Sequence, residues 1–357
     1  VLTGALEAFV ADYSRKKWTE EGRKIKVPTC KNKRVAIVGA GPAGLGCADI
    51  LSVCGYQVTV FDGKPAPGGL LVFGIPNFKL PKDVVNSIIQ DLKDMGITFI
   101  GNTVIGKDKS VDDLLEEGFE AVFIGVGAGV DATMGIPGED LPGVYKGSDF
   151  LILANTNPDV LPEGMEKDFK ISRKVIVVGG GDTASDCLRT GVRMDTDQML
   201  CVYRRTENEM PGSKKDRELA KEEGAEYQFL TQPVQFIAGD DGRLAAIECI
   251  QNRLGEPDEK GRRRPVAIEG TNFIIETEMA VLAIGYWPDQ TIAKTTPGLD
   301  IKRWGEIIVD PETGATTKPG VYAGGDAVTG PDLVVTAMAA GRKAAHSIDV
   351  FLKGKDA

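Results

Sequence analysis

The chain has 357 residues, which is long enough for two or three domains that each bury a core. Its 52 acidic and 42 basic side chains give a net charge of −10, so no nucleic acid and no anionic membrane is expected as a partner. Apolar runs stay below the ~20 residues of a membrane-spanning helix, and the expected location is the cytoplasm.

After a possible amphipathic helix over residues 6–13, the first organised feature is a glycine-rich turn at residues 39–44. It follows the nearly continuous apolar run 34–38, which predicts a parallel strand covered on both faces, and it precedes a predicted helix. Glycines in such a turn allow a tight bend and let a pyrophosphate approach the helix N-terminus, where free N–H groups favour negative charge. The expected dinucleotide contacts are Gly39, Gly41, Pro42, Ala43 and Gly44.

The end of the next strand indicates which dinucleotide the first turn binds. Residues 58–61 form the predicted strand, and Asp62 follows directly. A carboxylate at this place accepts hydrogen bonds from ribose hydroxyls and repels a 2′-phosphate. The first site is therefore expected to hold FAD or NAD. A later strand, residues 121–127, would bring its backbone past the same cofactor at Gly127.

A second glycine-rich turn, residues 179–184, repeats the arrangement after the β-branched run 175–178. Alanine replaces the third glycine, which is a permitted variant. The next strand, 200–203, ends in two arginines and no acid, and guanidinium groups are suited to bidentate pairing with a phosphate. The second site is therefore expected to hold NADP. Its expected contacts are Gly180, Gly181, Asp182, Thr183, Arg204 and Arg205, with Ala283, Ile284 and Gly285 at the end of a later strand.

The last third of the chain favours a flavin at the first site. A short strand ends in Gly325 and Asp326, and a helix is predicted to begin near Val334 and Val335. The Asp326 carboxylate can hold a ribitol hydroxyl of FAD. The start of the helix can stabilise negative charge on the flavin pyrimidine ring when the flavin is reduced.

Cysteine and histidine counts exclude several other chemistries. The six cysteines include no CxxC or CxxxxC pair, so neither a zinc ribbon nor a redox-active dithiol is expected. His346 is the only histidine, which leaves no His-rich metal site. Transfer between two bound cofactors needs no side-chain acid or base. We therefore expect no catalytic side chain and no metal ligand.

Residues 68–80, GGLLVFGIPNFKL, resemble the GGLL-x-[FY]-GIP-x-FKL stretch of the glutamate synthase small subunit family. That family includes the NADPH-handling half of dihydropyrimidine dehydrogenase and the large subunit of bifurcating ferredoxin:NADP oxidoreductases. Other matching motifs lie at 178–184, 203–206 and 323–326. The resemblance implies an oxidoreductase that transfers hydride between NADPH and FAD and passes electrons to an iron–sulfur acceptor. It also implies FAD contacts at Gly69, Leu70, Lys79 and Ile105.

The expected fold class is α/β, with two Rossmann-like dinucleotide-binding domains, the NADP domain being inserted in the FAD domain. The predicted FAD domain is 31–145 plus 288–357, the NADP domain is 146–287, and the chain crosses between them near Pro137 and Pro142 and again after Gly285.

Residues 1–30 resemble the final helix and linker of the Cys-rich iron–sulfur domain that precedes this region in family members. Because the chain begins at Val1 without Met, we expect a fragment. Any iron–sulfur clusters then lie on a missing segment or on a partner, such as a glutamate synthase large subunit or a ferredoxin-like protein.

Other functions stay open at this point. The motifs do not separate a glutamate synthase small subunit from the large subunit of a bifurcating ferredoxin:NADP oxidoreductase. A structural subunit that keeps FAD for stability without turnover is an alternative of another class, and the intact pair Arg204 and Arg205 argues against it. A thioredoxin-reductase-like enzyme is disfavoured because its dithiol would have to appear in the sequence.

Overall fold

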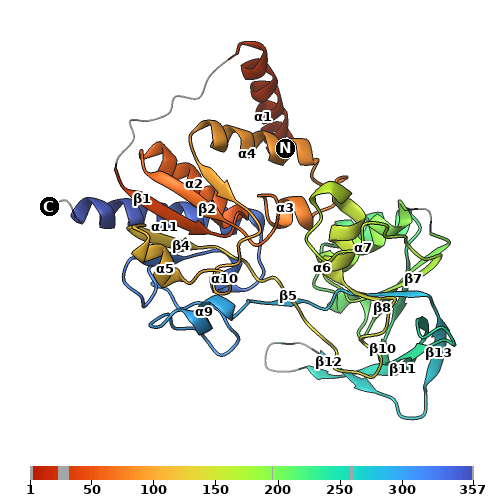
Figure 1. Ribbon diagram of the computed structural model, residues 1–357. Helices are drawn as coiled ribbons and strands as arrows, with labels where there is room; N and C mark the ends of the chain where they lie inside the picture. The colour runs from red at the N-terminus through yellow and green to blue at the C-terminus, as the bar shows by residue number, and fades with distance from the viewer. Residues whose placement is uncertain (1–2, 23–31, 195, 258–260, 262, 356–357) are drawn as a thin grey trace.

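The computed structural model describes residues 3–22, 32–194, 196–257, 261 and 263–355. Figure 1 shows two α/β bodies side by side, with the N-terminal helix lying outside both sheets, next to α4 of the first body. Each body is built on a five-stranded parallel sheet. The predicted α/β class with parallel sheets is confirmed.

The first body contains the sheet of order β16-β4-β1-β2-β3. Its two central strands are almost entirely apolar, and alternate side chains enter separate cores on the two faces of the sheet. Helices α2 (Pro42–Val53) and α11 (Val334–Gly354) cover one face together. The strands are β1 (Arg34–Val38), β2 (Gln57–Phe61), β3 (Thr98–Ile100), β4 (Ala121–Ile124) and β16 (Val321–Ala323).

The second body contains the sheet of order β6-β14-β7-β8-β9, whose strands are β6 (Val144–Lys146), β7 (Lys174–Val178), β8 (Gln198–Tyr203), β9 (Glu226–Phe229) and β14 (Met279–Leu282). Helices α6 (Gly147–Asn155) and α7 (Asp182–Val192) share one apolar core with this sheet, and α8 (Lys214–Glu222) adds Ala220 to it.

A four-stranded antiparallel sheet packs on the other face of the second body's parallel sheet. Its strands are β10 (Thr231–Ala238), β11 (Leu244–Pro257), β12 (Arg263–Ala267) and β13 (Phe273–Glu276). Phe236, Ile247 and Cys249 fill the space between the two sheets. Strands β11 and β12 form an antiparallel pair whose outer part is largely exposed.

The chain crosses between the bodies twice, and the two crossings pair with each other. Strand β5 (Val130–Asp131) leads into the second body, β15 (Tyr286–Trp287) leads back, and they form an antiparallel pair. Met134 and Ile136 already pack on the core of the second body. The first crossing therefore lies upstream of Pro137, because the apolar residues that follow β5 are buried against the second sheet.

The remaining helices of the described residues are mostly short. They are α1 (Thr3–Glu20), α3 (Leu70–Phe73), α4 (Lys82–Asp94), α5 (Val111–Glu116), α9 (Thr291–Thr295) and α10 (Asp326–Thr329), with 3-10 turns at Pro158–Val160 and Glu207–Glu209. The N-terminal helix is longer than expected, whereas residues 23–31, which include Cys30, lie outside the described part. Among the described helices, none has the length and apolarity needed to cross a membrane.

Candidate cofactor-binding sites

The first glycine turn has the geometry of a phosphate cradle. Gly39 has a φ of +102°, and a Cβ there would lie 2.4 Å from the carbonyl oxygen of Gly125. A Cβ on Gly44 would lie 1.8 Å from the carbonyl oxygen of Gly39. Gly41, at the N-cap of α2, would meet only the Cα of Gly69 at 4.0 Å. The outer glycines are thus needed for packing, and the middle one leaves the N-terminus of α2 open to a ligand.

Asp62 lies at the end of β2, beside this turn. Its carboxylate accepts hydrogen bonds from the backbone N–H groups of Ala40 (2.6 Å) and Lys64 (2.7 Å). Burial raises the pKa of Asp62, and the two backbone hydrogen bonds oppose that rise. Each oxygen keeps further acceptor capacity. The side chain is therefore placed and equipped to receive the hydroxyls of a ribose.

The segment after Gly68 folds over the first turn. Gly68 donates its N–H to the carbonyl of Ala40 (2.8 Å). Gly69 has a φ of +52°, and a Cβ on it would come within 2.7 Å of the Cα of Gly41. Leu70 then stays 53% exposed at the start of α3. The predicted contacts Gly69 and Leu70 thus lie directly beside the predicted pyrophosphate position.

Lys82 holds this segment in place, and the sequence analysis did not single it out. Its ammonium donates hydrogen bonds to the carbonyl oxygens of Leu71 (2.8 Å) and Ile75. Burial lowers the pKa of Lys82 to about 8. The residue follows the GIPNFKL motif by two positions, which is the only sequence signal that points to it.

The C-terminal part brings Gly325 and Asp326 to the same end of the first sheet. Gly325 has a φ of +69°, and a Cβ on it would lie 2.9 Å from the Cβ of Ala43. Asp326 begins α10, and burial raises its pKa to about 6. Val334 begins α11, while Leu333 and Val335 are 64% and 66% exposed. Exposed apolar side chains beside a polar cradle fit a ligand with a flat apolar ring system.

Ile105 and Gly127, two other predicted FAD contacts, can offer a ligand little besides their backbone atoms. The Ile105 side chain is buried in the first body's core, so only its main chain can face a ligand. Gly127 has a φ of +73°, and apart from its chain neighbours no atom of the described residues lies within 4 Å of the position that a Cβ would take there.

The second glycine turn repeats the cradle in the second body. A Cβ on Gly179 would lie 2.1 Å from the carbonyl oxygen of Ala283, and one on Gly180 would lie 2.5 Å from the Tyr203 ring. Gly181, the N-cap of α7, would meet nothing within 4 Å. Its neighbour Asp182 accepts a hydrogen bond from the N–H of Ser213 (2.7 Å). The space beside Gly181 at the N-terminus of α7 is therefore free for a ligand, as is the space beside Gly41 at the N-terminus of α2.

A cavity of about 350 Å³ opens beside this second turn. Arg204, Gly179 and Ile284 line it, together with residues 132–134 of the first crossing and 231–233 of β10. Arg205 has a buried Nε without a hydrogen-bond partner among the described residues. Arg204 places a guanidinium at the cavity, and Arg205 has an N–H group that is not hydrogen-bonded to any described residue. Such a cavity suits an anionic ligand group.

One of the two crossing strands, β15, contacts the second glycine turn. The hydroxyl of Tyr286 on β15 donates a hydrogen bond to Oγ1 of Thr183 (3.2 Å). Gly285 has a φ of +116° with open space around it, and Ile284 is 36% exposed. The predicted contacts Ala283, Ile284 and Gly285 thus lie where β14 ends, next to the second turn.

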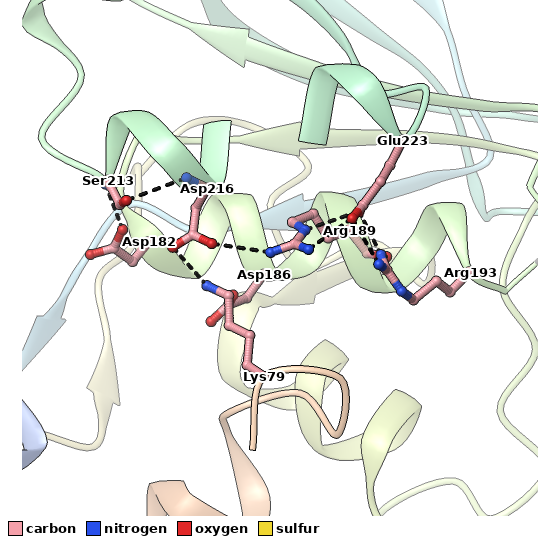
Figure 2. A network of polar contacts seen from close by, with 8 residues as sticks. All are labelled: Lys79, Asp182, Asp186, Arg189, Arg193, Ser213, Asp216 and Glu223. Atoms are coloured by element: carbon pink, nitrogen blue, oxygen red, sulfur yellow. Dashed lines mark hydrogen bonds and ion pairs between the residues drawn. The ribbon is translucent and has the colours of Figure 1, made fainter. Parts of the chain in front are cut away.

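Lys79 has its side chain in a different place from the other residues predicted to contact FAD. Its Nζ lies 2.5 Å from Oδ1 of Asp186 and 3.1 Å from Oδ2 of Asp216, on helices α7 and α8 of the second body (Figure 2). The expectation of a flavin contact came from the resemblance alone. The ammonium is here occupied by two carboxylates across the interface between the bodies.

Comparison with known proteins gives consistent results. The profile of a family described as pyridine nucleotide-disulphide oxidoreductase matches residues 33–341. The chain is 45% identical, over 98% of its length, to the putative oxidoreductase AegA of Escherichia coli (strain K12), and it covers 53% of that protein. It is 42% identical, over 99% of its length, to the glutamate synthase (NADPH) small chain of Halomonas elongata, of which it covers 74%.

Among solved structures, FprA of Mycobacterium tuberculosis in complex with NADPH matches with a TM-score of 0.73 at 21% identity. The match covers 91% of this chain and 86% of FprA. At that identity the likeness shows the fold. The chain spans about half the length of the first relative above, 53% of it, so the activity of a whole relative is not carried over directly.

Proposed function

Because the chain belongs to the pyridine nucleotide-disulphide oxidoreductase family, and within it to the group of the glutamate synthase small chains, we propose that it transfers hydride between NADPH and FAD and passes the electrons to an iron–sulfur acceptor. The predicted family and the two-dinucleotide-binding flavoprotein fold are confirmed by these relatives and by the likeness to FprA. The chain is an NADPH- and FAD-dependent oxidoreductase. The iron–sulfur acceptor is the proposed part.

One observation carries the assignment of the two cofactors. Two helices, α2 and α7, each begin at an open glycine after a buried parallel strand, in two different sheets. The neighbouring strand ends in Asp62 in the first body and in Arg204 and Arg205 in the second. A carboxylate favours an unphosphorylated ribose and guanidiniums favour a 2′-phosphate, so the two sites take different dinucleotides.

The residues of the first body fit FAD. The pyrophosphate would lie on Gly41 and the N-terminus of α2, and the adenosine ribose on Asp62. The flavin would lie between Leu70, Asp326 and the start of α11. When bound, FAD accepts a pair of electrons with one proton and can release electrons singly, which links a pyridine nucleotide to a one-electron acceptor.

The protein's own contribution is placement and charge. Lys82 holds the carbonyls of Leu71 and Ile75, and this fixes the segment that covers the pyrophosphate position. The first turn of α11 has free N–H groups that would favour negative charge on a flavin bound beside it. The exposed side chains of Leu70, Leu333 and Val335 would supply apolar surface to such a ligand.

The residues of the second body fit NADPH in the same way. Gly181 leaves the N-terminus of α7 open to the pyrophosphate, and Arg204 lines the adjacent cavity. Ala283 and Gly285 lie at the end of the neighbouring strand, on the side where Tyr286 contacts the second turn. We propose that these residues hold the nucleotide with its nicotinamide directed toward the first body.

Partner subunits are supported by the names of the relatives. Several are called a chain or a subunit of a larger enzyme, including a glutamate synthase small chain of Escherichia coli and a formate dehydrogenase subunit of Moorella thermoacetica. We propose that the partner of this chain carries iron–sulfur clusters, because a flavin can release electrons singly and such clusters accept them one at a time.

The test is anaerobic reduction of the flavin by NADPH and by NADH, followed by its absorbance. NADPH is expected to bleach the flavin at far lower concentration than NADH. Changing Arg204 and Arg205 together to Ser should raise KM for NADPH by about 10²- to 10⁴-fold, since charge-assisted contacts each contribute roughly 1.5–3 kcal/mol. The same change should leave NADH kinetics within twofold. Equal bleaching of the wild-type protein by both nucleotides would contradict the proposal.

A further inference from the structure

We propose that Phe78 and Lys79 form a latch that fixes the position of the flavin site relative to the nucleotide site, so that Lys79 acts as a positioning residue of the reaction. This inference rests on the proposed transfer between NADPH and FAD. It assigns Lys79 a role different from the direct flavin contact that the family resemblance implies.

The charged half of the latch is the ion-pair set around Lys79. Its Nζ contacts one carboxylate on α7, Asp186, and one on α8, Asp216 (Figure 2). The lysine side chain is only 23% exposed. Burial lowers its pKa, but the two carboxylates outweigh that effect and the net pKa is raised, so Lys79 is a cation at neutral pH.

The aromatic half is Phe78, which lies under two cations of the second body. The guanidinium of Arg193 lies 4.0 Å from the Phe78 ring centroid and that of Arg189 lies 4.7 Å from it. These distances are well within the range of a cation–π contact. Two consecutive residues of the first body thus meet α7 through two different kinds of interaction.

The receiving surface on the second body is itself held rigidly. Arg189 pairs with Glu223 through two hydrogen bonds (2.7 and 2.9 Å) and with Asp216 (3.0 Å). Arg193 also pairs with Glu223, and these hydrogen bonds lower the pKa of Glu223 to about 2. Figure 2 shows the carboxylate between the two guanidiniums. Bidentate pairs of this kind fix geometry as well as charge.

The residues on both sides of the latch lie close in the sequence to residues that contact or belong to a glycine turn. On the first body, Phe78 and Lys79 end the same segment whose Gly69 lies against Gly41. On the second body, Asp186 lies one helical turn after Asp182, directly behind the open N-terminus of α7. A movement of the latch would therefore shift one dinucleotide site relative to the other.

Buried ion pairs contribute little net stability, because desolvation offsets most of the attraction, but they favour one geometry over others. Transfer between two cofactors depends on separation, and a displacement of about 1 Å at the reacting atoms can cost about 10²-fold in rate. Loosening the latch is therefore expected to slow the transfer step more than it lowers folding stability or nucleotide affinity.

The test uses the FAD-loaded protein in anaerobic stopped flow with NADPH. Lys79→Met should slow flavin reduction by 10- to 100-fold, while FAD content, flavin spectrum and the Kd of NADPH stay within twofold. Lys79→Arg keeps the positive charge, and its decrease in the logarithm of the reduction rate should be at most half of that of Lys79→Met. The matched control is Lys318→Met, because Lys318 is comparably buried, 15% exposed, and pairs with Asp112 inside the first body.

A second variant separates the latch from a flavin contact. Asp186→Asn removes one of the two carboxylates that Lys79 contacts and changes no residue of the first body. It should slow reduction as Lys79→Met does, but by a smaller factor because Asp216 remains. The double variant Lys79→Met/Asp186→Asn should be no slower than the worse single variant, since both changes break one interaction. Loss of FAD from Lys79→Met, while Asp186→Asn keeps its FAD and reacts at the wild-type rate, would overturn the latch.

A measurement without NADPH distinguishes this inference from the proposed function. Amide hydrogen exchange is expected to rise in residues 75–80 and in α8 of Lys79→Met, and to stay unchanged in Lys318→Met. If wild-type protein fails to react with NADPH while this exchange pattern appears, the proposed function fails and takes the role of Lys79 in the reaction with it, whereas the contact between the two bodies is still supported. If wild-type protein reacts and Lys79→Met reacts equally fast, the latch is wrong.

Discussion

At the scale of single residues, the environment of a carboxylate decides what it can do. Asp62 and Asp326 both lie at the same end of the first sheet, but their surroundings differ. Asp62 accepts hydrogen bonds from the N–H groups of Ala40 in the first glycine turn and of Lys64 in its own loop. Burial raises the pKa of Asp326 to about 6. Ionising the Asp326 carboxylate is therefore costly in the protein without ligand. Hydroxyl groups that donate hydrogen bonds to the carboxylate would lower this cost.

Asp326→Asn is expected to stabilise the FAD-free protein above pH 6 and to weaken FAD binding. The folded pKa lies above the ordinary value of 3.8, so stability falls as pH rises from about 4 to 6, where the carboxylate ionises in the folded state. Because the side chain is partly exposed, we expect a gain of about 1 kcal/mol at pH 7.5 and almost none at pH 4.

Urea unfolding of FAD-free wild-type and Asp326→Asn protein at the two pH values measures this difference. Flavin titration of the same samples measures the change in affinity. An equal gain at both pH values would mean that the titration of Asp326 is not its cause.

At the scale of secondary-structure elements, the helices α2 and α11 of the first body cross in close contact at two glycines. A Cβ on Gly341 would lie 1.9 Å from the carbonyl oxygen of Ala43, and one on Gly46 would lie 2.9 Å from that of Met338. Both neighbours are backbone atoms, which cannot move aside without shifting a helix. Because Ala43 belongs to the first glycine turn, this crossing also sets the shape of the flavin site.

Gly341→Ala is expected to destabilise the protein by about 3 kcal/mol or more and to lower its FAD content, because overpacking against backbone forces α11 away from α2. Gly354→Ala is the matched control in the same helix, since nothing lies within 4 Å of its Cβ position. The control should be neutral or stabilising by up to about 1 kcal/mol. Thermal unfolding and the ratio of flavin to protein absorbance test both, and equal behaviour of the two variants would contradict the argument.

At the scale of the whole molecule, the two bodies share more than the covalent crossings. Helix α6 places Ile152 in the core of the first body, while Phe150 and Leu151 belong to the core of the second. Together with Phe78 and Lys79, this couples the unfolding of one body to that of the other. The bodies are therefore expected to unfold as one unit.

Removing FAD should lower the unfolding temperature of both bodies together. FAD present at 100 times its Kd adds about 2.7 kcal/mol to the folded state. Scanning calorimetry of loaded and FAD-free protein is expected to show one transition in each case, shifted as a whole. A second transition that keeps its temperature without FAD would mean that the second body unfolds independently.

Much of the fold was predictable because its signals are local. The glycine turns, the strand ends at Asp62, Arg204 and Arg205, and the last strand before Asp326 each depend on a few neighbouring residues. The structure has these strands and turns where the sequence predicts them, while the binding roles of the residues remain predictions. The latch was not predictable in this way. Lys79 and Asp216 lie far apart in the sequence, and neither residue type reveals its partner.

The position of the first crossing was missed for a related reason. The prolines near residue 137 suggested a linker, but Met134 and Ile136 are covered by the second body's core, and no local pattern distinguishes such residues from an exposed connection. Gly341 likewise looks like an ordinary helix glycine until its neighbour on α2 is known. Long-range packing decided these positions, and a single sequence does not contain it explicitly.

The pairing of β5 with β15 brings the entry and exit of the second body to one place, with Asp131 opposite Tyr286. A module whose two ends are neighbours can be cut out and replaced without reshaping its host. Shuffling of such modules offers a simple route by which a constant flavin half acquires a different electron donor. A chimaera joined at this pair of strands, carrying a donor module from a distant homologue, would be the natural object for studying that exchange.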